Sequence, residues 1–284
     1  MKVMWSKKIS IGKCGSYLIL SLMTLFCAFP LIYAFFGSFK SSVEFLNGGS
    51  NILPEIWDFT SYAKAWEEAN FAQYTINSLV ISGTTVVLTL VVGSMAAYVL
   101  ARTTFRAKPF LITLLGLVMF IPSVVLIFPI FTMCQRLNLM GNIWSIIITQ
   151  TASGLPFLVI LMQSYMVSIS KEIDEAAEMD GCSFFKKFYL IIMPLSKPIL
   201  ATVALFAFKN AWNSYLLPLA LSLSKPEIRP LTVGVIALKD MGEGISAWNI
   251  MIAGSVLAIF PMVIVYLFMN RYFVEGITAG SVKG

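Results

Sequence analysis

The densest group of chemically active side chains in this sequence is a run of acids between two long apolar stretches. Five carboxylates fall within nine residues there: Glu172, Asp174, Glu175, Glu178 and Asp180. Charge runs of this kind are commonly solvated loops with no further role. Here Ala177 and Gly181 lie one helical turn apart, so the backbone of another protein could approach closely. The small residues favour a docking surface, with the solvated loop as the alternative.

Two short helices are expected to carry these acids. Ser170 is a suitable N-cap for the first helix, and Glu172 and Asp174 would lie in its first turn, where the helix dipole favours anions. Gly181 should end that helix, and Ser183 should cap a second helix that runs to about Leu190. Two prolines beyond it mark the start of the next apolar stretch.

A second group of polar and aromatic side chains lies inside the apolar stretch from about residue 198 to 221. It contains Asn210, Trp212, Asn213 and Tyr215, with Lys209 beside them. Polar groups at membrane depth usually face a cavity or another helix, and aromatic faces are common in the walls of ligand sites. These residues therefore either line a solute path or join helices through hydrogen bonds and packing. The residues alone favour neither alternative.

Other kinds of site chemistry find little support in the sequence. It contains no histidine, the most common general base and metal ligand. The four cysteines have no metal-ligand spacing and are expected to be small hydrophobic residues. There is also no phosphate loop of the G-x-x-x-x-G-K-[ST] type. We therefore expect no catalytic residues, no metal site, no cofactor in this chain and no ATP hydrolysis by this chain alone.

The composition indicates a protein whose solvent is lipid. Hydrophobic residues make up 58% of the chain and charged residues only 12%, whereas a soluble domain carries about a quarter charged residues. The mean hydropathy of +0.84 agrees. The net charge of +6 is spread in short patches between apolar stretches, which excludes the single basic face expected of a nucleic-acid-binding protein.

Six apolar stretches are long enough to cross a bilayer, for which a helix needs ~20 residues. They run from Gly15 to Phe39, Ile76 to Leu100, Pro109 to Cys134, Asn142 to Met166, about Pro198 to Leu221, and Trp248 to Met269. The first is too long for the apolar core of a signal peptide and is expected to be retained. The sequence therefore predicts an all-α membrane protein with six transmembrane helices.

The distribution of basic residues predicts the orientation of these helices. The tails and the loops at 101–108 and 167–197 together carry about twice as many Lys and Arg residues as the opposite side. By the positive-inside rule both tails, residues 1–14 and 271–284, are cytoplasmic, and the segment 40–71 is external. The acidic loop then lies in the cytoplasm of a cell with this protein in its inner membrane.

The acidic loop resembles the EAA loop of ABC importer permeases. The matching residues are Glu175-Ala176-Ala177, then Gly181, Ile191 and Pro194, with Met193 where Leu is usual. Further segments are similar to the MalG-like permeases of carbohydrate importers: Asn77-Ser78-Leu79, Ala96-Ala97-Tyr98 with Ala101-Arg102 and Phe105, Trp212-Asn213-Ser214-Tyr215 with Pro218, and the tail 276–284. Together these segments extend over most of residues 70–284.

The resemblance implies a type I ABC importer permease fold, with residues 72–270 as the ABC transmembrane type-1 domain and 170–194 as its coupling loop. In that family the loop docks on a separate ATPase, which here would involve Glu175, Ala176, Ala177, Asp180 and Gly181. It further implies a second, MalF-like permease, two ATPase subunits that hold ATP and Mg, and an extracytoplasmic solute-binding protein. The implied substrate is a sugar or oligosaccharide.

Three alternatives are weighed against this interpretation. A permease of the same type could carry another solute, such as a glycerol phosphate. A self-contained secondary transporter is typically larger and has intramembrane carboxylates, whereas none of the 14 acids here lies inside an apolar core. An intramembrane enzyme is disfavoured because no Ser or Asp constellation lies at membrane depth.

Overall fold

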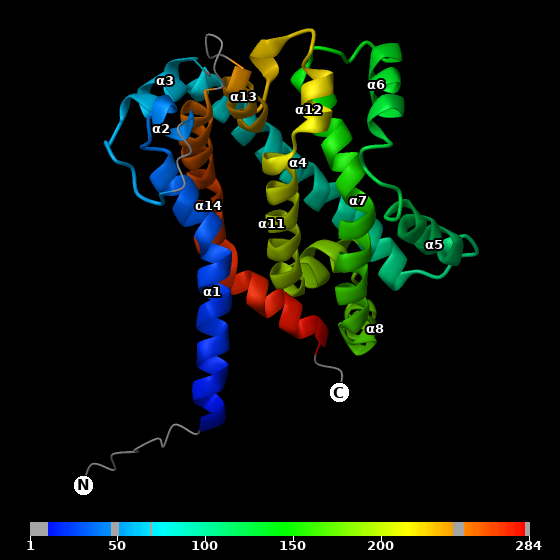
Figure 1. Cartoon of the computed structure of the whole chain (residues 1–284). Coiled ribbons are helices and arrows are strands. Elements are labelled where there is room, and N and C mark those ends of the chain that lie inside the picture. The colour runs from blue at the N-terminus through cyan, green and yellow to red at the C-terminus, as the bar shows by residue number, and fades with distance from the viewer. Residues whose placement is uncertain (1–10, 47–50, 69, 241–246, 282–284) are drawn as a thin grey trace. The chain divides into compact units, whose positions relative to one another are not determined.

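The described part of the chain is helical throughout its regular structure. The computed structural model describes residues 11–46, 51–68, 70–240 and 247–281 (Figure 1). Of the expected tails, 1–14 and 271–284, the parts at 1–10 and 282–284 lie outside these residues. The described residues form two compact units, the first within Met1–Glu67 and Leu238–Leu257 and the second within Glu68–Ala237 and Ala258–Gly284.

The first unit contains a cluster of aromatic rings around the buried Phe39, which follows the long helix α1 (Ile11–Gly37). The ring of Phe39 packs against Trp57, Phe59 and Tyr62, with centroid separations of 5.2, 5.2 and 5.3 Å. The short helices α2 (Ser42–Leu46) and α3 (Thr60–Glu68) fall in the segment expected to be external. The turn η3 (Leu238–Asp240) and the start of α14 (Trp248–Ser281) complete the unit.

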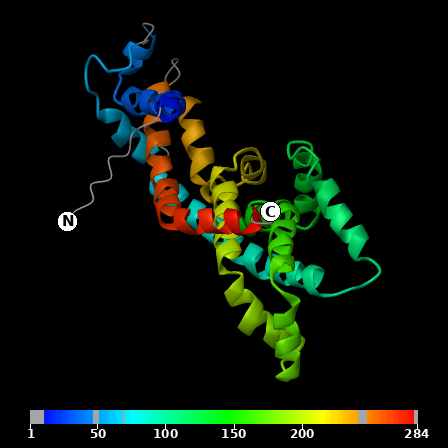
Figure 2. The same cartoon turned by 90° about the horizontal axis from the view of Figure 1, so that it is seen from below.

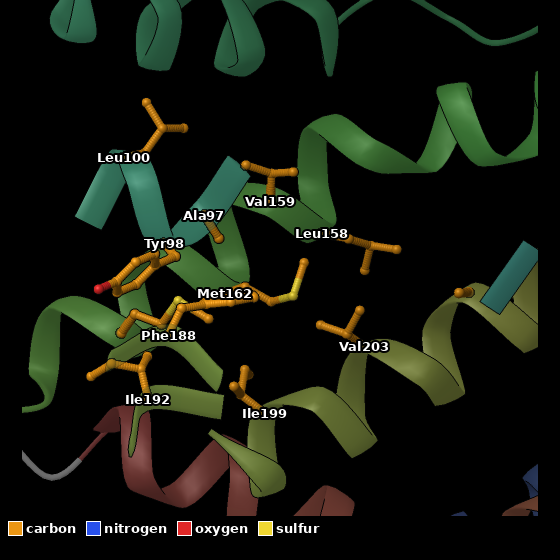
Figure 3. Close-up of a cluster of buried hydrophobic side chains, with 12 residues drawn as sticks. Ala97, Tyr98, Leu100, Leu158, Val159, Met162, Phe188, Ile192, Ile199 and Val203 are labelled. Atoms are coloured by element: carbon orange, nitrogen blue, oxygen red, sulfur yellow. The ribbon is translucent and has the colours of Figure 1, made fainter. Parts of the chain in front are cut away.

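Three helices form the framework of the second unit. These are α4 (Phe71–Arg102), α7 (Ile143–Ser168) and α11 (Lys197–Asn213), which pack on one another (Figures 1 and 2). Gly93 on α4 permits the close approach of α7, because a Cβ atom there would lie 2.7 Å from the terminal carbon of Met162. The side chains of Ala97, Tyr98 and neighbouring residues of all three helices share a buried apolar cluster (Figure 3).

Two of the six expected spans are broken, and a proline lies at each break. The third divides into α5 (Lys108–Val118) and α6 (Ile127–Arg136), which lie at the edge of the unit (Figures 1 and 2). The ring of Pro122 would collide with the carbonyl of Val118, four residues earlier, if α5 continued. The fifth divides after α11 for the same reason: Pro218, in α12 (Leu216–Leu221), excludes a helical Ser214, whose ψ is 134°.

The other four expected spans are single helices. Among the described residues, α1, α4, α7 and α14 are long and apolar enough to cross a membrane. The segment Phe184–Leu195 and helix α11 would also satisfy this test together, but they meet at a bend of 79°. The prediction of an all-helical, multi-span protein is therefore confirmed, while two of its six spans were wrongly expected to be continuous.

The segment after α12 closes over the first turns of α4. The side-chain amide of Asn77 donates to the carbonyl oxygens of Glu227 and Arg229 at 2.7 and 2.9 Å. The hydroxyl of Ser78 accepts from the backbone N–H of Leu231 at 2.8 Å. These bonds satisfy the backbone at η2 (Pro226–Ile228) and at the start of α13 (Leu231–Ala237).

Candidate docking loop and solute hollow

The acidic segment forms the first of two short helices, as expected. Helix α8 (Lys171–Met179) begins where the hydroxyl of Ser170 accepts from the N–H of Glu172 at 3.3 Å. It ends at Gly181, whose φ of +78° is the left-handed conformation that favours glycine. The N–H of Cys182 then closes the turn on the carbonyl of Ala177 at 2.9 Å.

The second helix is shorter than expected and changes its winding. Ser183 caps α9 (Phe184–Lys187) by accepting from the N–H of Lys186 at 3.4 Å. The chain continues as a π-helix, η1 (Phe188–Ile192), and one further turn, α10 (Met193–Leu195), before the 79° bend into α11. A π-helix is rare and is often found at functional sites.

The five acids of the loop divide into two groups. Asp174 and Glu178 are paired inside the chain, Asp174 with Arg102 and Glu178 with Lys187. Glu172, Glu175 and Asp180 are exposed, and no ion pair within the described residues involves them. The sequence did not separate these groups. Among the described residues, only the three carboxylates without an ion pair are free to face a partner.

The small residues of the loop also divide. Ala176 and Gly181 are exposed, and a Cβ atom placed on Gly181 would meet nothing within 4 Å. Ala177, however, is only 5% exposed and lies on the inner side of α8. Its small size therefore serves packing within this chain, and the contact of Ala177 with an ATPase stays a prediction. The helical period placed Ala176 and Ala177 on nearby faces, but it did not say which face points inward.

Lys187 binds the two short helices of the loop to each other. It is buried and donates a hydrogen bond to the carboxylate of Glu178, which is exposed on its outer side. That hydrogen bond raises the pKa of Lys187 above its ordinary value, although the loss of hydration on burial opposes it. The ammonium group therefore stays charged at physiological pH, and the pair holds α8 against α9.

The C-terminal end of α4 contacts the loop and supports it, a relationship that sequence reasoning missed. Nε of Arg102 lies 3.0 Å from Oδ2 of Asp174, without the alignment of a hydrogen bond, so this contact is an ion pair. Nη2 of Arg102 donates to the carbonyl oxygen of Ile169 at 3.1 Å. One turn earlier, the ring of Tyr98 lies against Phe184 and Phe188, with centroids 4.6 and 5.1 Å apart. The sequence indicated Tyr98 and Arg102 only through the resemblance of their segment to a known loop.

A hollow of about 860 Å³ opens beside the other end of α11. Its wall comes from the α5–α6 break, α7, the end of α11 and the start of α12: Val118, Met119, Ile121, Pro122, Ser123, Val124, Leu126, Ile127, Ile130, Gln150, Ser153, Gly154, Pro156, Phe157, Asn210, Ser214, Tyr215, Leu216 and Leu217. All of these side chains are uncharged. Nε2 of Gln150 is buried in this region, with no hydrogen-bond partner among the described residues. The polar groups of Gln150, Ser153 and Ser214 were not expected as part of this site.

The four residues expected on the solute path are not all in this wall. Asn210 and Tyr215 line the hollow, whereas Asn213 is exposed outside it. Trp212 is buried; its ring stacks on Phe208 at 5.5 Å, and its Nε1 donates to the carbonyl of Ala258 at 3.3 Å. Trp212 therefore joins helices, which was the alternative left open by the sequence.

The fold and its loop define a polytopic helical membrane protein with a capped, acidic two-helix loop between α7 and α11. Residues 89–278, which contain this loop, match the family described as "Binding-protein-dependent transport system inner membrane component". The chain belongs to this family, and it is therefore the membrane component of a transport system. The resemblance to ABC importer permeases is confirmed.

The relatives are permeases of ABC transport systems. The chain is 33% identical to "Probable ABC transporter permease protein YurM" of Bacillus subtilis over 98% of this chain and 91% of the relative. It is 31% identical to the arabinooligosaccharides transport system permease protein AraQ of the same organism, over 98% and 99% of the two chains. The diacetylchitobiose uptake system permease protein NgcG of Streptomyces coelicolor is 30% identical, over 94% and 88%.

The structural comparison agrees with the family. The chain superposes on a chain of a bacterial ABC transporter involved in the import of the acidic polysaccharide alginate, with a TM-score of 0.78. The two are 26% identical, and the match extends over 96% of this chain and 100% of the other. The predicted fold, a permease of an ABC importer, is therefore the observed one.

Proposed function

We propose that this chain is a permease subunit of an ATP-driven, binding-protein-dependent importer of sugars or oligosaccharides. The observation that carries the proposal is the capped α8–α9 loop, with an exposed Gly181 and three exposed carboxylates that have no ion pair within the described residues, in a sequence without a phosphate loop. Such a chain needs a separate ATPase, and this loop is a ready docking element for one. The names of AraQ and NgcG support an oligosaccharide as the solute.

The remaining subunits follow from the same proposal. Two ATPase subunits would hold ATP and Mg, and this chain would hold no cofactor. A second, homologous permease would complete the path, and an extracytoplasmic binding protein would deliver the solute. The family's description as binding-protein-dependent supports that last partner. The surplus of basic residues beside the loop and in the tails supports cytoplasmic termini, with the loop facing the ATPases.

The hollow beside α11 is the proposed wall of the solute path in this subunit. It offers amide and hydroxyl groups from Gln150, Asn210 and Ser214 beside the ring of Tyr215, the mixture of hydrogen-bonding and aromatic surface that suits a neutral sugar. A phosphate ester would be expected to meet a basic group, and Lys209 is exposed outside this wall. This favours a sugar over a glycerol phosphate.

The test is purification of the complex with a tag on this chain, followed by reconstitution in liposomes. We expect two ATPase subunits and a second permease to copurify. With the cognate binding protein, radiolabelled arabinooligosaccharide or diacetylchitobiose should accumulate only with ATP, and glycerol 3-phosphate should not. The matched control replaces the phosphate-loop lysine of the ATPase and should abolish accumulation. Concentrative uptake by this chain without any ATPase would contradict the proposal.

A further inference from the structure

Arg102 connects the docking loop to the longest helix of the second unit. It is the last residue of α4, and its guanidinium contacts the loop at two separate points, the carboxylate of Asp174 and the backbone of Ile169. The side chains of Arg102 and Asp174 are 6% and 14% exposed. An ion pair so well shielded from water is screened much less than one on the surface.

Within the described residues, the two ion pairs of α8 have different effects. The pair between Glu178 and Lys187 joins α8 to α9, so it holds the two short helices together as one body. The pair between Asp174 and Arg102 joins that body to α4. The rings of Tyr98, Phe184 and Phe188 pack beside this second connection. The loop is thus attached to α4 directly, and not only through its chain connections to α7 and α11.

Helix α4 continues from this attachment to the far side of the unit. It packs along its length on α7 and α11, and these two helices carry Gln150, Ser153 and Asn210 of the hollow. Displacement of α8 that is transmitted through Arg102 would therefore move α4 against the helices of the hollow. Packed helices of this kind move as rigid bodies. A polar contact between α8 and the end of α4 can therefore transmit a movement of α8 to the whole of α4.

We propose that Arg102 is a positioning residue for transport, which passes movement of the docked α8 into α4 through Asp174. This rests on the proposed function of the loop. Arg102 touches neither solute nor nucleotide in this role. Its removal should uncouple the hollow from ATP hydrolysis without separating the subunits.

The test follows the hollow directly and needs no identified solute. In the purified complex with the native cysteines of this chain replaced by serine, Asn210→Cys is labelled with a membrane-impermeant maleimide, in ADP and again in ATP with vanadate. The ratio of the two labelling rates reports the nucleotide-driven change at the hollow. Arg102→Ala, Asp174→Ala and the double variant are compared with Arg106→Ala, a control on an exposed arginine four residues away.

We expect each single variant to bring the labelling ratio about tenfold closer to one, the scale of a lost charge contact that is shielded from water. The double variant should be no worse than Arg102→Ala, because the ion pair with Asp174 is already lost once Arg102 is removed. ATP hydrolysis and copurification should persist, Arg102→Lys should recover part of the ratio, and Arg106→Ala should behave as the parent. If Arg102→Ala does not assemble, Arg102→Lys and Asp174→Asn carry the comparison.

Two results would overturn the proposal. One is an unchanged labelling ratio in assembled Arg102 and Asp174 variants, and the other is additive losses in the double variant. A parent complex with no ATPase activity and no nucleotide-dependent labelling would instead contradict the function proposed for the whole chain, so the two failures are distinguishable.

Discussion

The hydroxyl of Tyr98 donates to the carbonyl oxygen of Phe184 at 3.2 Å, and the two rings lie 4.6 Å apart. One side chain of α4 thus supports the start of α9 both by packing and by a hydrogen bond, at a point where a helix N-terminus meets the bundle. The buried cluster continues from Tyr98 into α7 and α11 (Figure 3). The loop therefore packs against the buried core of the second unit.

Substitutions at Tyr98 separate these two contributions. Tyr98→Phe keeps the ring and removes the hydrogen bond, so we expect a loss of about 1 kcal/mol. Tyr98→Ala also leaves a cavity in the cluster and should cost about 3–5 kcal/mol. The thermal unfolding midpoint of the purified complex in detergent measures both. Equal midpoints for the two variants would show that the ring contributes nothing to the stability of the loop.

The position of these supports shows where sequence reasoning reached its limit. The helix ends at Ser170, Gly181 and Ser183 were predictable because capping depends on residues only a few positions apart. The pairing of Arg102 with Asp174 was not, because it joins residues far apart in the chain and needs the α4–α7 packing to exist first. The charge pattern showed five acids, but it did not show which of them form ion pairs within this chain.

The broken spans are a different case, because their cause was present in the sequence. Hydropathy alone extended the third and fifth spans through Pro122 and Pro218. In a helix, the ring of a proline clashes with the carbonyl group four residues earlier. This rule would have ended the two helices at Val118 and near Ser214, where they end in the structure. Membrane helices tolerate some prolines, however: Pro156 lies inside α7. The proline positions therefore indicated possible breaks, and only the packing decided which occurred.

Gly181 provides a test of the docking face. Its φ of +78° costs a non-glycine residue about 1–2 kcal/mol, and asparagine tolerates this conformation best. We expect Gly181→Asp to abolish uptake while the protein remains in the membrane, because it adds bulk and charge at the exposed end of α8. Gly181→Asn is the matched control, with a similar size and no charge. Uptake near the parent level in Gly181→Asp, at normal protein abundance by immunoblot, would contradict a docking role for this end.

Glu175 tests whether charge contributes to docking. Its carboxylate is exposed and unpaired among the described residues. Glu175→Gln should weaken binding of the ATPase subunits and should also flatten the dependence of that binding on salt, because an interfacial charge is lost. The measurement is the fraction of ATPase retained on the tagged complex between low and high ionic strength. Glu227→Gln, at an exposed acid far along the chain in η2, should leave both quantities unchanged.

The lining of the hollow separates Asn210 from Trp212 and Asn213, which the sequence had placed in one group, and this separation can be tested. Asn210 and Gln150 line it, so Asn210→Ala and Gln150→Ala should raise the solute concentration needed for half-maximal uptake by about 2- to 10-fold, the range for a typical net hydrogen bond. Asn213→Ala should leave uptake kinetics unchanged, because that side chain lies outside the wall. Trp212→Phe should lower the unfolding midpoint through loss of the hydrogen bond to Ala258, with little effect on the half-maximal concentration. If Asn213→Ala changes uptake more than Asn210→Ala at equal stability, the path runs along another face of α11 and this hollow is not its wall.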